Sequence, residues 1–187
     1  MPDKPYPQRK SPRLQGYDYS QSGAYFVTIC TAGRAHLFGE IVDGEMVLND
    51  YGRTAETCWA EIPDHHPTAD IDLYVIMPNH VHGIIVIDDD IVSSTGGRDV
   101  SRPYENADVG TPYMASVSPK TDQKHPTLGT IIGTYKAAVT RKIHHPDLKI
   151  WQGRYHDHII RNEKSLNKLR EYVLYNPARW EDDVFYK

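Results

Sequence analysis

The chain has 187 residues and a formal net charge of −4, and 39% of its residues are hydrophobic. This length and composition predict one globular domain with a sizeable core. The N-terminus is polar and rich in proline, and the longest apolar stretches have the length of strands. We therefore expect no signal peptide, no transmembrane helix and a cytoplasmic protein. Cys30 and Cys58 lie in apolar contexts without Cys-x-x-Cys spacing, which indicates buried thiols and disfavours a thiolate zinc site.

The charges are unevenly distributed along the chain. Residues 38–110 carry 15 acidic and 3 basic side chains, whereas residues 125–170 carry 9 basic and 3 acidic side chains. The second segment can form a basic face on an acidic protein, and such a face suits phosphate groups. An evenly solvated helix surface explains a modest excess of this kind equally well.

The first half of the chain reads as an arm followed by strands around one helix. Residues 1–22 are expected to form a basic N-terminal arm, and the β-branched and aromatic residues of 24–31 predict a strand. Residues 38–48 suggest a small hairpin that turns at Asp43-Gly44, a dipeptide suited to a type I′ turn. Apolar residues at helical spacing predict a helix over 50–62, which Pro63 ends.

Two further strands, 71–77 and 80–87, are separated by little more than Pro78-Asn79 and are expected to pair as a hairpin. Residues 88–124 are rich in Asp, Ser, Gly, Pro and Thr without periodicity, which indicates a flexible insertion. The pattern resumes with elements that we expect at 127–143 (helix), 150–160 (strand) and 165–176 (helix ended by Pro177), before a tail at 181–187.

Leaving the small hairpin aside, the order is strand, helix, strand, strand, helix, strand, followed by a C-terminal helix. This order predicts an α+β fold: a ferredoxin-like antiparallel sheet with helices on one face, in a single domain over residues 23–180. In that topology the third core strand, 80–87, is central.

His80 and His82 alternate with Val81 at the start of this apolar strand. Side chains along a strand have a period of two, so both imidazoles point to the same face. Two imidazoles on a rigid strand make a good half of a metal site. A second pair with the same spacing, His156 and His158, shows that histidines at strand ends or in loops are the alternative explanation.

Tyr172 and Asn176 stand four residues apart in the C-terminal helix and so share one helix face. Without further context, Tyr172 could simply be an amphipathic residue at the border of the apolar stripe of Leu166, Leu169 and Val173. Tyrosine is a weak nucleophile and needs a base, a metal or a nearby cation. Lys168, one turn earlier, is one such cation, although a lysine there is more often solvated.

In combination, these motifs resemble the HUH single-tyrosine transposases, and most closely the REP-associated tyrosine transposases, relatives of the IS200-like enzymes. The matching segments run in family order over residues 17–180: 23–28 (GAYFVT), 75–83 (VIMPNHVHG), 151–155 (WQGRY), 158–162 (HIIRN) and 172–177 (YVLYNP). The long insertion at 88–124 departs from the family pattern.

The resemblance implies that His80, His82 and Asn176 hold a divalent metal, Mg²⁺ or Mn²⁺, and that Tyr172 attacks single-stranded DNA. The product would be a 5′-phosphotyrosine and a free 3′-hydroxyl. The expected partner is single-stranded palindromic DNA folded as a hairpin. We expect the protein to be a monomer or a homodimer and to have no membrane partner. Arg154, Arg161, Lys136 and Arg141 are expected near phosphates, with Tyr155 or Trp151 available for stacking on bases. For Trp151, core packing is the preferred reading.

Two other functions stay open at this point. The chain could be a domesticated protein that binds DNA hairpins without catalysis. It could also be a metal-dependent nuclease in which water attacks and His156 and His158 enlarge the metal cluster.

Overall fold

The computed structural model describes residues 14, 16–88 and 126–186. Most of the expected N-terminal arm and, apart from Asp88, the whole of the 88–124 insertion lie outside these residues. None of the helices in the described part of the chain combines the length and the apolar character needed to cross a bilayer.

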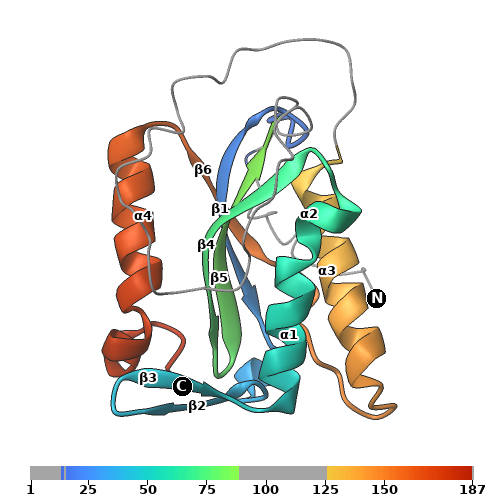
Figure 1. Ribbon diagram of the computed structural model, residues 1–187, viewed down its shortest axis with the longest axis vertical. Coiled ribbons are helices and arrows are strands. Elements are labelled where there is room, and N and C mark those ends of the chain that lie inside the picture. Colours follow the sequence, from blue (N-terminus) through green and yellow to red (C-terminus); the bar gives the residue numbers. More distant parts are fainter. Residues whose placement is uncertain (1–13, 15, 89–125, 187) are drawn as a thin grey trace, which may run out of the picture.

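A four-stranded antiparallel sheet forms the centre of the molecule (Figure 1). Its order is β4 (Ala69–Met77), β5 (His80–Ile87), β1 (Gly23–Cys30) and β6 (His156–Ile160). This is the strand order of a ferredoxin-like sheet, so the predicted fold class is confirmed. The strand β5 is central as expected, and all eight of its residues are buried.

The helices α1 (Asp50–Ala60) and α3 (Leu128–Ile143) cover one face of the sheet (Figure 1). The largest core cluster lies there, where Val27, Ile29 and Ile85 of the sheet meet Trp59 of α1 and Tyr135 of α3. The predicted hairpin is confirmed as β2 (Gly39–Val42) and β3 (Glu45–Leu48). Asp43 and Gly44 turn it with φ of 52° and 81°, the positive values that a type I′ turn requires.

The helix α4 (Glu163–Tyr175) packs on the opposite face, with a short 3₁₀ helix, η4 (Pro177–Asp182), after it (Figure 1). Asn162 caps α4 by accepting a hydrogen bond from the Ser165 amide at 2.9 Å. Leu166 packs against Ile84 and Val86, and Val173 packs against Val75 and Met77. Because these contacts are apolar and buried, they fix the rotation of α4 on the sheet.

Two predicted elements differ from the structure. The helix expected over 50–62 ends at Ala60, and Pro63 lies instead in the first turn of a separate short helix, α2 (Ile62–His65). Pro is accepted there because the first turn of a helix needs no amide donor from it.

The strand expected over 150–160 was wrong in its first half, since β6 begins at His156. The apolar residues before it are buried in the core without joining the sheet, apart from a single bridge between Trp151 and Thr31. The Trp151 ring lies 5.3 Å from that of Phe38, and its Nε1 donates to the Lys136 carbonyl at 3.1 Å. The core reading of Trp151 is therefore confirmed.

Candidate active site

His80 and His82 project from β5 toward the face of the sheet that α4 covers. They are 0% and 1% exposed, and their ring centroids are 4.4 Å apart. The alternation along β5 places the pair there, because Val81 and Gly83 between and after them face α1 and α3. The strand geometry predicted for the histidine pair is thus present.

A chain of hydrogen bonds sets the orientation of His80. The Asn79 amide nitrogen donates to the Phe185 carbonyl at 2.7 Å, so the Asn79 amide oxygen is the atom that faces His80 Nδ1 at 2.8 Å. An amide oxygen can only accept, which means that Nδ1 carries the proton and Nε2 keeps its lone pair. This Nε2 atom is buried, and no group in the described part of the chain makes a hydrogen bond to it.

Burial keeps both imidazoles neutral at neutral pH. Desolvation lowers the pKa of His80 to about 4, although the Asp183 carboxylate opposes this shift and the Arg34 guanidinium adds to it. Desolvation, and then the neighbouring His80, lowers the pKa of His82 well below its usual value. Its Nδ1 lies 2.8 Å from Thr28 Oγ1, which leaves Nε2 as the nitrogen that faces α4. Neutral imidazoles are the form that binds metals.

Tyr172 reaches the histidine pair from α4. Its hydroxyl lies 3.2 Å from His82 Nε2, and its ring centroid is 5.1 Å from the His82 ring and 6.0 Å from the Phe26 ring. The side chain is nevertheless 38% exposed, so a substrate can approach it. Desolvation, followed by the charge of Asp183 and a hydrogen bond to it, raises the pKa of Tyr172 to about 12.

Asn176, one turn after Tyr172, ends α4 and is 3% exposed. Its amide nitrogen donates to Asp183 Oδ2 at 2.7 Å, whereas its buried amide oxygen has no hydrogen-bond partner among the described residues. A carboxylate accepts only, so this contact determines which end of the amide remains free. The free end is the oxygen, a ligand atom that hard cations prefer.

Asp183 and Phe185 complete the site from the segment after η4, and sequence reasoning missed both of them. The donor atoms of His80, His82 and Asp183 lie within 4.8 Å of one another. Phe185 lies over the histidines, with its ring centroid 4.8 Å from that of His80. No pattern in residues 181–187 pointed to this role, since the sequence there shows no periodicity and was expected to be a tail.

The donor set fits a divalent metal. Within residues 14, 16–88 and 126–186, nothing donates a hydrogen bond to the buried acceptors His80 Nε2 and Asn176 Oδ1, which is costly unless another group satisfies them. His82 Nε2 and the Asp183 carboxylate lie beside them. Imidazole nitrogens and amide and carboxylate oxygens are all ligand types that divalent metals accept.

The four basic residues predicted to bind DNA do not form one group. Lys136 and Arg141 lie on α3, on the face of the sheet away from Tyr172, and the Lys136 ammonium donates to the Gln152 carbonyl at 2.5 Å. Arg154 is exposed just before β6, and Arg161 is exposed just after it.

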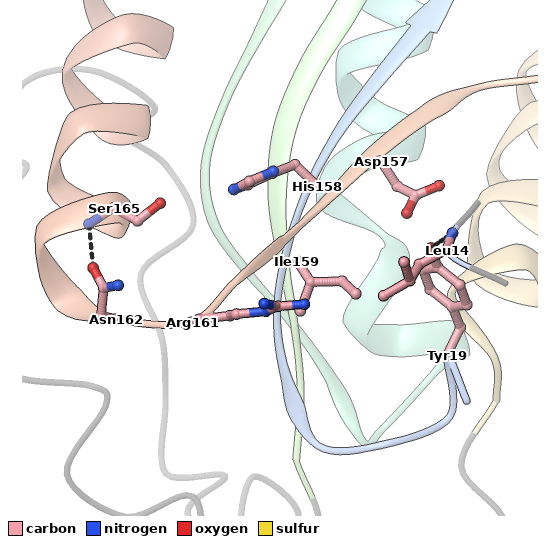
Figure 2. Close-up of a pocket in the computed structure, with 8 residues that line it drawn as sticks. All are labelled: Leu14, Tyr19, Asp157, His158, Ile159, Arg161, Asn162 and Ser165. Carbon is pink, nitrogen blue, oxygen red and sulfur yellow. Dashed lines mark hydrogen bonds between the residues drawn. The ribbon is translucent and has the colours of Figure 1, made fainter. Parts of the chain in front are cut away.

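Arg161 lines a hollow of about 510 Å³ at the edge strand β6, together with His158 and the first turn of α4 (Figure 2). His156 and His158 are exposed on β6. In the described part of the chain, neither of them joins the group of His80, His82 and Asp183.

Comparison with known proteins identifies a relative. No family model matches the chain. An uncharacterized protein of Haemophilus influenzae is 37% identical over 180 residues, which cover 95% of this chain and 93% of that protein. This chain and the Haemophilus protein belong to one family.

Solved structures show which fold this family has. A REP-associated tyrosine transposase bound to a REP hairpin matches with a TM-score of 0.56 and 18% identity, over 90% of this chain and 73% of that chain. The fold is that of a REP-associated tyrosine transposase, as the sequence motifs predicted. A putative transposase from Deinococcus radiodurans matches with a TM-score of 0.43 and 12% identity, over 86% of this chain and 94% of that chain.

Proposed function

We propose that this chain is a transposase, a metal-dependent enzyme that nicks single-stranded DNA and transfers the strand with Tyr172 as nucleophile. The observation that carries the proposal is the approach of the Tyr172 hydroxyl to 3.2 Å from Nε2 of the buried His82. A half-exposed tyrosine whose oxygen adjoins a histidine pair fitted for a metal is the arrangement that such an attack needs.

The reaction exchanges one phosphoester bond for another. The Tyr172 oxygen bonds to the scissile phosphorus and the bond from phosphorus to the 3′ oxygen breaks, which leaves a 5′-phosphotyrosine and a free 3′-hydroxyl. The proton that Tyr172 loses is balanced by the proton that the leaving 3′ oxygen gains. Because the phosphotyrosine retains the bond energy, transfer to another 3′-hydroxyl needs no ATP.

The surroundings of Tyr172 explain why the attack depends on a metal. With a pKa of about 12, the hydroxyl is protonated at neutral pH, so the attack needs a group that takes the proton or offsets the developing charge. A divalent metal held by His80, His82 and Asn176 would polarise the scissile phosphate. It would also offset the negative charge that develops near the tyrosine oxygen during the attack. The packing of Val173 on β4 and of Leu166 on β5 holds α4, and with it Tyr172, in register with the histidines.

The proposed substrate is single-stranded DNA that folds as a hairpin. The transposase with the same fold is bound to a REP hairpin, and Arg154 and Arg161 supply exposed cations at the two ends of β6. The β6 residue His156 pairs with Thr28, and Thr28 pairs with His82, so β6 begins level with the site. We therefore place the DNA phosphates along β6, away from Lys136 and Arg141 on α3.

Covalent trapping tests the proposal. The protein is incubated with Mn²⁺ and a pool of hairpin oligonucleotides with randomised single-stranded flanks, labelled at the 3′ end, and analysed by denaturing electrophoresis. We expect a labelled protein–DNA adduct from the wild type and from Tyr175→Phe, and none from Tyr172→Phe. Tyr175 is a matched control because it is also an exposed tyrosine of α4, at 47% exposure. Its ring lies over Arg179, 5.8 Å from the guanidinium, whereas the Tyr172 ring lies beside His82.

Other results would select the rival functions. Hairpin binding without cleavage in the wild type would indicate a domesticated DNA-binding protein. Cleavage that survives in Tyr172→Phe, without an adduct in the wild type, would indicate a nuclease in which water attacks.

A further inference from the structure

Asp183 brings a carboxylate to the histidine pair from outside the elements that carry the rest of the site. It follows η4 near the end of the chain, whereas the histidines lie on β5 and Tyr172 and Asn176 on α4. Its side chain is nonetheless part of the group whose donor atoms lie within 4.8 Å of one another.

The main chain around Asp183 is held in place by local hydrogen bonds and by contacts with distant residues. The Phe185 amide donates to Asp183 Oδ1 at 2.7 Å, and the Tyr186 amide donates to the Asp183 carbonyl at 3.0 Å. The Arg34 guanidinium donates to the Val184 carbonyl at 3.2 Å, while Asn79 holds the Phe185 carbonyl. The carboxylate is therefore positioned before any ligand arrives, which reduces the entropy lost on binding.

The second oxygen of Asp183 points into the site. Oδ2 lies 2.7 Å from the Asn176 amide nitrogen and 3.3 Å from the Tyr172 hydroxyl. The contact with Asn176 leaves the oxygen of that amide, which has no partner in the part of the chain that the structure describes, as the available ligand atom. Asp183 thus adjoins each of the residues that the proposed function assigns to the chemistry.

We propose that Asp183 is an oxygen ligand of the same metal that His80, His82 and Asn176 hold, an inference that rests on the proposed function. Two imidazoles and an amide are neutral, so a divalent cation among them would be buried with its full charge, which is costly. One carboxylate halves that charge. It also adds the hard oxygen ligand that distinguishes a Mg²⁺ or Mn²⁺ site from the nitrogen-rich sites that favour Zn²⁺ or Cu²⁺.

Mn²⁺ binding measured by calorimetry, without DNA, tests the assignment. Asp183→Asn keeps the shape of the side chain and an acceptor for Asn176, but removes the charge. Asp182→Asn is the matched control, since it makes the same charge change at the adjacent exposed residue. We expect Asp183→Asn to weaken Mn²⁺ binding at least tenfold and Asp182→Asn to change it less than twofold. A second readout is the rise in Tm on adding Mn²⁺, which should be smaller in Asp183→Asn.

Thermal melting in EDTA checks that Asp183→Asn and Asp182→Asn are equally folded. Asp183→Glu, which keeps the charge, should bind Mn²⁺ more tightly than Asp183→Asn. Equal Mn²⁺ affinities of Asp183→Asn and Asp182→Asn, with His80→Ala still abolishing binding, would overturn the role of Asp183 and leave the proposed metal site standing. A wild type that binds no Mn²⁺ would overturn both.

Discussion

The side-chain amide of Asn79 donates to the main-chain carbonyl of Phe185 at 2.7 Å, joining the turn before β5 to a segment 106 residues further along the chain. The same amide presents its oxygen to His80 Nδ1 at 2.8 Å. One fully buried asparagine therefore orients an imidazole and anchors the segment that carries Asp183.

We expect Asn79→Ala to lower the free energy of unfolding by about 2 kcal/mol, because it leaves a buried imidazole N–H and a carbonyl unsatisfied. It should also weaken Mn²⁺ binding, since His80 loses its orientation and Asp183 its anchor. Urea denaturation and calorimetry measure the two effects. A variant with wild-type Mn²⁺ affinity would show that the Asn79 contacts do not position the site.

The histidine pair should be indispensable for metal binding and cleavage. His80→Ala and His82→Ala are expected to abolish Mn²⁺-dependent cleavage of hairpin DNA, because each removes one of two buried imidazole ligands. His156→Ala, which changes an exposed histidine on β6, should retain a substantial part of the activity. Equal losses from His156→Ala and His80→Ala would contradict the assignment and point to a larger cluster.

Where an element has a regular side-chain period, the sequence was sufficient to predict which side chains share a face. A period of two along β5 predicted that His80 and His82 share a face, and a spacing of four on α4 predicted the same for Tyr172 and Asn176. The apolar stripe of Leu166, Leu169 and Val173 then implied which side of α4 meets the sheet. These local rules, together with the family resemblance, led to His80, His82, Tyr172 and Asn176, but not to Asp183 or Phe185.

Asp183 could not be predicted because no local rule governs its segment. The segment is held by hydrogen bonds from the Arg34 and Asn79 side chains, more than 100 positions earlier, to the carbonyls that follow Asp183. For the same reason, the sequence wrongly predicts a strand over residues 150–155. Its apolar residues resemble a strand, but the packing of Trp151 between Phe38 and Tyr135 favours an irregular segment.

Gly83, next to His82, is a packing requirement of the site. A Cβ atom there would come within 2.2 Å of Trp59 Cζ2, so the indole of α1 would have to move. We expect Gly83→Ala to lower the free energy of unfolding by about 2 kcal/mol, the usual cost of overpacking a core. Gly133→Ala, in α3, places the new Cβ within 4 Å of no described atom beyond its chain neighbours and its own helix backbone, so it should instead stabilise the protein by roughly 0.5–1 kcal/mol. Thermal melting distinguishes the two, and equal Tm values would contradict the packing argument.

The last prediction concerns pH and follows from the burial of His80. Its pKa is about 4 in the folded protein and 6.5 when unperturbed, so the unfolded chain binds more protons between these values. Stability therefore rises with pH across this window: the contribution is complete above pH 6.5 and is lost as the pH falls toward 4. By linkage, His80 alone should remove about 2 kcal/mol of unfolding free energy between pH 7 and pH 5.

Other groups also titrate over this range, so the difference between variants is the measurement. Urea denaturation of metal-free protein at pH 7 and pH 5 should show a smaller loss in His80→Gln than in the wild type. His145→Gln serves as the control, because it removes an exposed histidine of the loop after α3 and should lose as much stability as the wild type. The same loss in His80→Gln as in His145→Gln would mean that His80 takes up its proton without opening the site. Its imidazole would then not be held neutral by the packing of Trp180 and Phe185 around it.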